Sequence, residues 1–567
     1  MKRLLQLFCT LLLAGSAFAG SVSSDFKYTN PLTPVTVVVQ FSKAPTASLI
    51  GLFTTQGATA RKQFKHFPMI QVITIPAIMV PIIAKLPGVK YVTPNRAVVR
   101  HLDITTATVG SALANQLGWT GAGVGVAVID SGIDVTNIDL NVPNSAVSRV
   151  VYSQDFVGTG TNDFYGHGSH VAGIIGGNGA NSGGKYHGIA PGVHLINLRA
   201  LDETGAGTDA SVIAAIDAAI ELQQTYNIRV INISLGRDIY ESWAQDPLCQ
   251  AVEAAYQAGI VVVVAAGNDG RDNSAATLGY ATVTAPGNDP FVITVGAMKS
   301  EGTADRSDDM VASYSSKGPT LVDLFVKPDL VAPGNGVASI RVPGSTLDLE
   351  FPTNVIDPTT YGAPAGSVSE YISLNGTSMA TPVVAGAAAL LIQQNPSITP
   401  DQVKGRLMLT ATKTFPVTSV AVDPTTGLTY TAYYDIFTIG SGYLDVMAAI
   451  GSSSLPPGTT PSPVAVFNSS NNTITVVNAN DIAWGDDIAW GDDIAWGDDI
   501  AWGDDIAWGD STVWGASVLY QGSNIAFTTA SPLTQSTTKG FSVVWTSSTS
   551  WATMTPGAAS IGGKGEK

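Results

Sequence analysis

Residues 260 to 266 read IVVVVAA, an unbroken apolar run of seven residues. Its length and its β-branched side chains are typical of a strand buried on both faces. Residues 209 to 224 and 247 to 258 have the apolar spacing of helices. The alternation predicts an α/β domain whose parallel sheet is covered by helices on both faces. Four further runs share the apolar strand pattern: residues 124 to 129, 193 to 198, 229 to 233 and 291 to 295.

Three polar residues stand at the ends of such elements. Asp130 ends the first apolar run in AVIDSGID, His167 lies between glycines in YGHGSHVAG, and Ser378 precedes a small, apolar helix in NGTSMATPVVAG. Taken singly, each has an ordinary structural interpretation as a turn, cap or core residue. Together, at the carboxyl ends of parallel strands, they supply the carboxylate, base and nucleophile that acyl transfer requires.

These motifs, in the order Asp, His, Ser, resemble those of the subtilisin-like serine proteases, the S8 or subtilase family. The similarity extends from about residue 107 to residue 450, and the order is the one that subtilisin has. The resemblance implies a three-layer subtilisin-like domain and a serine endopeptidase. In it, Ser378 is the nucleophile, His167 is the general base and then acid, and Asp130 orients the imidazole.

The same resemblance implies an oxyanion hole and a specificity pocket. Asn268 in AAGND would direct its amide N–H₂ at the developing oxyanion, together with the backbone N–H of Ser378; an Asn before Asp-Gly also indicates a turn, and both roles are compatible. Two uncharged segments with glycines resemble the walls of the pocket, where an extended peptide would bind with an apolar or mixed preference. These segments comprise Ser234, Leu235, Gly236, Ala265, Ala266 and Gly267.

Metal sites have weaker support. Asp139 matches an aspartate that binds calcium in many subtilisins, but the loop from 178 to 188 (NGANSGGKYHG), which would complete the site, holds no carboxylate. His167 and His170 lack the spacing and the Glu of an H-E-x-x-H zinc motif. We therefore assign no metal ligand and no cofactor, and calcium is the only candidate.

The chain begins with the three parts of an export signal. Two cations, Lys2 and Arg3, precede an apolar run from 4 to 13, and an A-x-A cleavage pattern ends at Ala19. The run is too short for a membrane span, which needs about 20 apolar residues. We expect residues 1 to 19 to be a signal peptide, no membrane span to follow, and the protein to be secreted.

Residues 20 to 106 form a basic segment with nine cations and two Asp, whereas the whole chain has a net charge of −16. Its three apolar runs predict a small α+β unit. Residues 89 to 99 (VKYVTPNRAVV) resemble the closing strand of the inhibitory propeptide, of inhibitor I9 type, that subtilases carry. We expect a propeptide that inhibits the acidic remainder, aided by opposite charge, and is then cut off by that remainder.

The remaining sequence predicts a peptidase domain from 107 to 452, a linker from 453 to 480 and a β-rich repeat region from 481 to 567. Residues 341 to 371 and 414 to 438 are interpreted as insertions that form surface loops near the cleft. The linker is inferred from its Gly, Ser and Pro content.

Residues 481 to 510 are five perfect copies of DIAWGD. In an extended chain Ile and Trp of each copy share a face, and Gly-Asp-Asp indicates a turn, so stacked short strands are one interpretation. Two others remain open: calcium binding by the paired Asp residues, and binding of a polymer or cell surface by exposed Trp.

The function predicted from these features is a secreted serine endopeptidase, made as a zymogen that processes itself. Its partners would be polypeptide substrates and its own propeptide. Nucleic acid is excluded as a main partner, because 28 Lys and Arg are set against 44 Asp and Glu. The alternative is a surface-binding protein that uses the repeat on a protease-like scaffold.

Overall fold

A computed structural model gives the structure of the chain. The longest stretch that the structure describes runs from residue 104 to residue 468, without residues 275–276, 417 and 424–425. The chain divides into two compact units, Met1–Arg100 and His101–Lys567, and each is considered by itself. The predicted signal peptide, from 1 to 19, and the DIAWGD repeats lie outside the described residues. Also described are residues 21–22, 31–43, 45–46, 60–63, 69–86, 88–94, 473–477, 519–520 and 523–524.

The first unit contains a five-stranded sheet in the order β1-β5-β2-β4-β3. Apolar residues Val37, Val39 and Phe41, which alternate along β2, pack with Val80 and Ile83 of the helix α3. The three apolar runs of the basic segment are strands, although residues 95 to 99 of the expected closing strand lie outside the described residues. The elements are β1 (Ser21–Val22), β2 (Pro34–Phe41), β3 (Ala60–Gln63), β4 (Met69–Pro76), η1 (Ala77–Met79), α3 (Val80–Ala84) and β5 (Val89–Pro94).

The second unit is built on an eight-stranded sheet. The order is β12-β11-β10-β9-β6-β8-β7, and β13 also pairs with β11. Every pairing is parallel except that of β12 with β11. The strands are β6 (Gly125–Asp130), β7 (Val150–Asp155), β8 (His194–Arg199), β9 (Ile228–Ile233), β10 (Val261–Ala265), β11 (Ile293–Lys299), β12 (Met310–Val311) and β13 (Leu330–Asn335).

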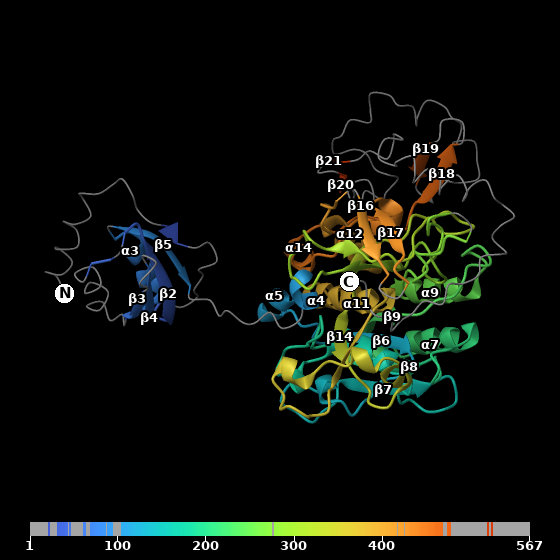
Figure 1. Cartoon of the computed structure of the whole chain (residues 1–567), viewed down its shortest axis with the longest axis horizontal. Coiled ribbons are helices and arrows are strands. Elements are labelled where there is room, and N and C mark those ends of the chain that lie inside the picture. The colour runs from blue at the N-terminus through green and yellow to red at the C-terminus, as the bar shows by residue number, and fades with distance from the viewer. Residues whose placement is uncertain are drawn as a thin grey trace. The chain divides into compact units, whose positions relative to one another are not determined.

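Helices cover both faces of this sheet (Figure 1). Within β6, Val126 and Val128 pack into a core shared with α6, α11 and α14, whereas Ala127 and Ile129 pack into a core shared with α7 and α9. Alternate residues of one strand thus face opposite layers, and the predicted α/β architecture with a mainly parallel central sheet is confirmed. The helices are α6 (His167–Gly176), α7 (Asp209–Glu221), α9 (Pro247–Gln257), α11 (Thr377–Gln394) and α14 (Val446–Gly451).

The sequence pattern located all five predicted strands but missed β7, the two-residue β12 and β13. Polar residues in VVYSQD conceal β7 and a Pro-Gly pair in LVAPGN conceals β13 from a search for apolar runs, and β12 is too short to form one. The predicted helix from 209 to 224 ends at Glu221, and the short α8 follows. The smaller elements are α4 (Ile104–Thr108), α5 (Ser111–Gln116), η2 (Ile138–Leu140), η3 (Ala180–Ser182), α8 (Gln223–Tyr226), α12 (Pro400–Thr410) and α13 (Ile436–Ile439).

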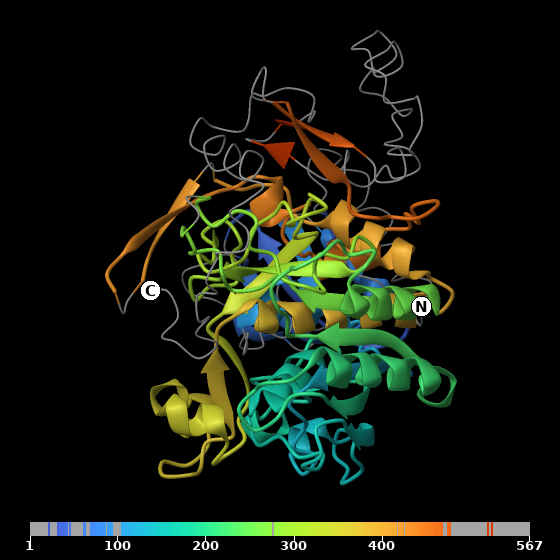
Figure 2. The ribbon, with the colours of Figure 1, turned by 90° about the vertical axis from the view of Figure 1, so that its right-hand side faces the viewer.

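The two predicted insertions contain secondary structure. Figure 2 shows the segment from 341 to 371, in yellow, as a lobe beside the domain. The hairpin of β16 and β17, in orange, extends from the domain at another place. The lobe connects β14 to β15, which pair antiparallel. The elements in and around the two insertions are β14 (Val337–Ile340), α10 (Thr346–Glu350), η4 (Pro352–Asn354), η5 (Pro358–Tyr361), β15 (Tyr371–Leu374), β16 (Thr418–Val422) and β17 (Thr429–Tyr433).

None of the helices among the described residues has the length and hydropathy needed to cross a membrane.

The first part of the predicted linker from 453 to 480 packs against the rest of the second unit. Thr460 and Ser462 are buried, and the chain then pairs with residues 324 to 326 through Val464 and Ala465. Composition indicated a linker because Gly, Ser and Pro favour turns, but it does not report burial. Strands follow at β18 (Val464–Asn468), β19 (Thr473–Val477), β20 (Leu519–Tyr520) and β21 (Ser523–Asn524).

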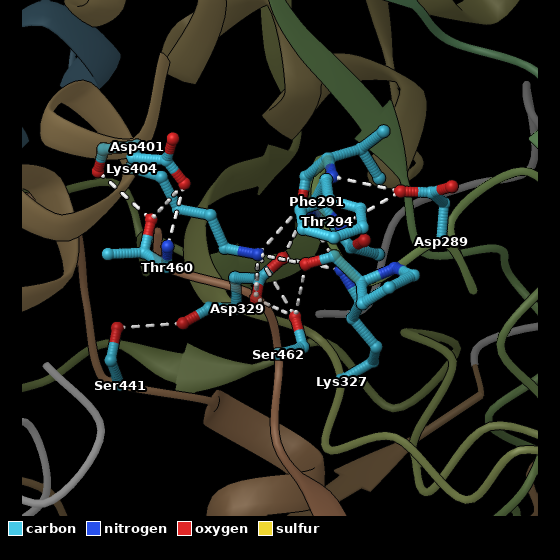
Figure 3. Close-up of polar contacts among 12 residues, drawn as sticks. Asp289, Phe291, Thr294, Lys327, Asp329, Asp401, Lys404, Ser441, Thr460 and Ser462 are labelled. Carbon is cyan, nitrogen blue, oxygen red and sulfur yellow. Dashed lines mark hydrogen bonds and ion pairs between the residues drawn. The ribbon is translucent and has the colours of Figure 1, made fainter. Parts of the chain in front are cut away.

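A buried charge cluster holds this segment (Figure 3). Asp329 lies 2.8 Å from the Nζ of Lys327 and 3.2 Å from the Nζ of Lys404, and all three side chains are at most 1% exposed. The hydroxyl of Ser462 lies 2.7 Å from Asp329 and 3.0 Å from Lys404. Burial acts to raise the pKa of Asp329, but the two ammonium groups and its hydrogen bonds bring it below its ordinary value. Ser462 therefore completes the solvation of buried charges.

Replacing Ser462 with Ala should lower the free energy of unfolding by about 1.5–3 kcal/mol, the usual contribution of a hydrogen bond to a charged group. Ser453→Ala is the matched control, because Ser453 belongs to the same predicted linker but is exposed. Thermal unfolding followed by circular dichroism measures both. Equal stability of the two variants would mean that the segment is not held by the cluster.

Candidate active site

Asp130 and His167 are brought together by the end of a strand and the start of a helix. Asp130 is the last residue of β6 and His167 the first of α6. The Nδ1 of His167 lies 2.8 Å from the Oδ1 of Asp130, and both side chains are at most 2% exposed. Gly168 permits this approach, because a Cβ there would lie 3.2 Å from the Cβ of Asp130 and 2.2 Å from the carbonyl oxygen of Gly132. The carboxylate therefore determines the orientation of the ring.

The pKa of His167 is set by opposing effects. Burial acts to lower it, whereas the charge and hydrogen bond of Asp130, and the charge of Asp163, act to raise it, and the result lies above the ordinary value. Neighbouring carboxylates thus favour the imidazolium form. This direction suits a base that must hold a proton during reaction.

Asp163 is a residue that the sequence analysis missed. It is buried, and its carboxylate accepts hydrogen bonds from Ser131 Oγ, the backbone N–H of Gly166 and the backbone N–H of Ser169 at 2.7–2.8 Å. Burial raises its pKa despite these bonds. The carboxylate therefore joins the loop after Asp130 to the loop that leads into His167. A carboxylate four residues before the histidine was the available signal.

Ser378 is the second residue of α11, at the positive end of a buried 18-residue helix. Its hydroxyl donates to the carbonyl oxygen of Ser234 at 3.1 Å, and Ser234 Oγ donates in return to the carbonyl oxygen of Ser378 at 2.9 Å. The Nε2 of His167 is buried and has no hydrogen-bond partner in the described part of the chain. The structure packs α6 against α11 but forms no hydrogen bond between the serine and the histidine. Such bonds often form only when substrate is bound.

Asn268 follows β10 and lies beside the start of α11. Its Oδ1 accepts hydrogen bonds from the backbone N–H of Thr377 at 2.8 Å and from Thr377 Oγ1 at 3.1 Å. A backbone N–H can only donate, so the side-chain atom of Asn268 that accepts from Thr377 must be the amide oxygen. The other terminal atom of the amide is therefore Nδ2. A Cβ on Gly376 would lie 3.5 Å from this Nδ2. An amide donor is therefore held next to the backbone of Gly376 and Ser378.

The two predicted pocket walls meet at a residue that the sequence analysis did not identify. A Cβ on Gly236 would lie 2.5 Å from Thr284 Oγ1, and one on Gly267 would lie 3.0 Å from Thr284 Cγ2. The N–H of Thr284 donates to the carbonyl of Ala266, and Ala285 exchanges two backbone hydrogen bonds with Arg237. Ser234, Ala265 and Ala266 are buried, whereas Leu235 is half-buried and Gly236 exposed. The side chain of Thr284 thus lies between the wall glycines.

The residues around Asp139 do not fit a calcium site. Its Oδ1 accepts from the N–H of Asn181 at 2.7 Å, and its Oδ2 accepts from Tyr371 OH at 2.5 Å. Arg149, itself buried, donates to the carbonyl oxygens of Asp139, Asn141, Gly176 and Val193. Burial lowers the pKa of Arg149 to about 10, so it stays a cation at neutral pH. A guanidinium and a phenol thus occupy donor positions toward oxygens of the kind that calcium takes as ligands.

His170 also has no metal-binding role. Its Nε2 lies 3.1 Å from the carbonyl oxygen of Val337 and 3.2 Å from that of Ile372, and burial lowers its pKa to about 3. Within the described ranges, no three His, Cys, Asp or Glu side chains gather as a metal site would require.

Replacing Tyr371 with Phe should cost about 1.5–3 kcal/mol of stability, because buried Asp139 loses one of its two side-chain hydrogen bonds. Tyr361→Phe is the control, since Tyr361 belongs to the same aromatic cluster but bonds no carboxylate. Millimolar calcium should leave the midpoint of thermal unfolding of Tyr371→Phe unchanged. A calcium-dependent rise in the unfolding midpoint of Tyr371→Phe would contradict this, provided that the rise is absent from the double variant Asp139→Asn, Tyr371→Phe.

Comparison with known proteins places this site in a family. The sequence profile of the subtilase family, peptidase family S8, matches residues 121–428, which include Asp130, His167, Asn268 and Ser378. The chain belongs to the subtilase family. It is therefore a subtilisin-like serine-type peptidase.

Relatives with curated descriptions agree with this membership. Serine protease AprX of Bacillus subtilis (strain 168) is 39% identical over 340 residues, which cover 58% of this chain and 71% of AprX. Subtilisin E of the same organism is 34% identical over 400 residues, 70% of this chain and 87% of subtilisin E. The extracellular serine proteinase of Thermus sp. (strain Rt41A) is 38% identical over 295 residues, 52% of this chain and 56% of that protein.

Proposed function

We propose that this chain is a secreted endopeptidase that hydrolyses polypeptides through an acyl-enzyme and is made as a self-processing zymogen. The observation that carries the chemical part is the buried 2.8 Å hydrogen bond between Asp130 and His167, with Ser378 at the start of the adjacent helix. The alternative of a protease-like scaffold for an adhesive repeat is less well supported, because this pair and the Asn268 donor are both intact.

Each side chain has one role in this proposal. His167 takes the proton of Ser378 as its oxygen attacks the peptide carbonyl, and then donates it to the leaving amine. Asp130 holds the ring and stabilises its cationic form. The Nδ2 of Asn268 and the backbone N–H of Ser378 donate to the oxyanion.

Secretion and processing are supported by the sequence. Residues 1 to 19 have the pattern of an export signal, and one relative is named an extracellular proteinase. The basic unit before residue 100 is compact and has its own core, as a folded inhibitory propeptide would.

Ser378→Ala should abolish casein hydrolysis and release of the prosegment, because the hydroxyl nucleophile is lost; removal of this residue costs about 10⁶-fold in subtilisin. Ser397→Ala is the control, an exposed serine that follows α11. Reaction with a fluorophosphonate probe should be lost only in Ser378→Ala. Casein hydrolysis by pure Ser378→Ala would refute the proposed function.

The position of Thr284 refines the specificity. A β-branched side chain between Gly236 and Gly267 limits the depth available to the substrate residue before the cleaved bond. The two pocket walls carry no charged side chain that could pair with a charged substrate residue at this position. We therefore infer a preference for small or medium uncharged residues at this position.

Thr284→Gly should favour substrates with Phe or Leu before the cleaved bond. The ratio of their kcat/KM to that of the substrate with Ala at this position should rise by about 10- to 100-fold. Thr284→Val, which keeps the shape, should leave the ratio within about threefold. A panel of peptides that differ only at this residue measures it. An unchanged Phe to Ala ratio in Thr284→Gly would exclude Thr284 from the pocket.

A further inference from the structure

The lobe from 341 to 371 contacts the backbone directly before His167. The N–H of Thr346 donates to the carbonyl of Phe164 at 3.0 Å, and the N–H of Leu347 donates to that of Tyr165 at 3.0 Å. Gly166 lies so close to the lobe that a Cβ there would be 2.4 Å from Ser345 Oγ. Three consecutive residues of the lobe thus contact the three residues that lead into His167.

We propose that the ion pair between Arg341 and Asp348 acts as a clasp that positions His167, by holding residues 345 to 347 against residues 164 to 166. This inference rests on the proposed function, in which His167 is the general base. Arg341 and Asp348 are positioning residues, because they act through the loop and do not touch the reacting atoms.

The clasp joins three parts of the lobe. Arg341 contacts Asp348 through two parallel hydrogen bonds of 2.5 and 2.9 Å, and its Nη1 donates to the carbonyl of Ser369 at 2.9 Å. Asp348 also accepts from the N–H of Gly344 at 2.8 Å. Because the pair is bidentate and only 17% and 7% exposed, it holds one geometry more firmly than a surface pair would.

The pKa of Asp348 is consistent with a formed pair. Burial acts to raise it, but the hydrogen bond of Arg341, the N–H of Gly344 and the charge of Arg341 bring it below its ordinary value. The carboxylate therefore remains ionised in the pH range where a histidine titrates.

The helix that carries His167 has a separate anchor. His170 bonds the carbonyls of Val337 and Ile372, and Ser339 Oγ donates to the carbonyl of His170 at 2.7 Å. These contacts come from β14 and β15, not from residues 345 to 347. Loss of the clasp should therefore loosen the loop before His167 while α6 stays folded.

The pocket walls do not depend on the clasp either. Gly236 follows β9 and Gly267 follows β10, and both are fastened to the segment that contains Thr284. Loosening of residues 164 to 166, the histidine loop, should thus reduce kcat with little change in KM. A misplacement of 1 Å in a catalytic group can cost 100-fold, so about tenfold is expected for partial loosening.

The pH profile supplies a second readout. The groups that face His167 are Asp130 from β6, Asp163 and Tyr165 from the preceding loop, and His170 from its own helix. Asp130 raises the pKa of His167, so the pKa falls when the imidazole and the carboxylate of Asp130 move apart. Because the base must be neutral to react, the acid limb of kcat/KM should move to lower pH in the variant.

The experiment compares Arg341→Met and Asp348→Asn with Arg306→Met. Arg306 forms a 2.8 Å pair with Asp445 that is 21% and 23% exposed, which makes it a matched ion pair outside the lobe. Thermal unfolding, kcat and KM on a soluble peptide, and the pH profile are measured for each. Fluorophosphonate titration corrects for the fraction of folded enzyme.

We expect all three variants to lose similar thermal stability, but only Arg341→Met and Asp348→Asn to lose about tenfold in kcat and shift the acid limb. Arg341→Lys, which keeps the charge but not the paired hydrogen bonds, should lie between wild type and Arg341→Met and remains informative if the other variants fail to fold. Equal loss of kcat in Arg306→Met, or a rise in KM alone, would overturn the clasp. If Ser378→Ala is inactive but Arg341→Met has wild-type kcat, this inference alone fails.

Discussion

The hydrogen bond between Asp130 and His167 connects the two layers on which the site depends. It ties the last residue of the central strand β6 to the first residue of α6, and both groups are almost fully buried. A buried carboxylate is stable only when hydrogen bonds compensate for lost water. The Oδ1 of Asp130 accepts from the N–H of Ser131 as well as bonding His167, and the neighbouring carboxylate of Asp163 accepts from Ser131 Oγ and the N–H of Ser169. The geometry of the site is thus a consequence of solvating charge inside the protein.

Buried cations fasten the periphery of the domain in the same way. Arg149 gathers four backbone carbonyls near Asp139, and Lys404 gathers the carbonyls of Pro290 and Val292 together with Ser462. Each cation draws together segments that are distant in the sequence, because a carbonyl that bonds a buried charge cannot leave without exposing it. Arg341 extends this principle to the lobe beside the proposed catalytic base.

The sequence predicted the central part of the fold because its signals are local. Apolar runs identified β6, β8, β9, β10 and β11, and the motifs at their ends identified Asp130 and His167. It missed Asp163, Thr284 and the clasp because polar residues follow no period and their partners lie far along the chain. Ser462 shows the reason most clearly, since its segment has the composition of a linker while Lys404, 58 residues earlier, buries it.

What the sequence determined alone was the order of buried strands and helices and the residue types at their ends, because hydrophobic periodicity and motif chemistry act over a few residues. Only the tertiary structure decided that Nδ1 of His167 faces Asp130, that Thr284 lies between the two wall glycines, and that a lobe of the chain reaches the histidine loop. Those outcomes depend on how segments tens to hundreds of residues apart satisfy one another's buried charges and backbone groups, which no local pattern encodes.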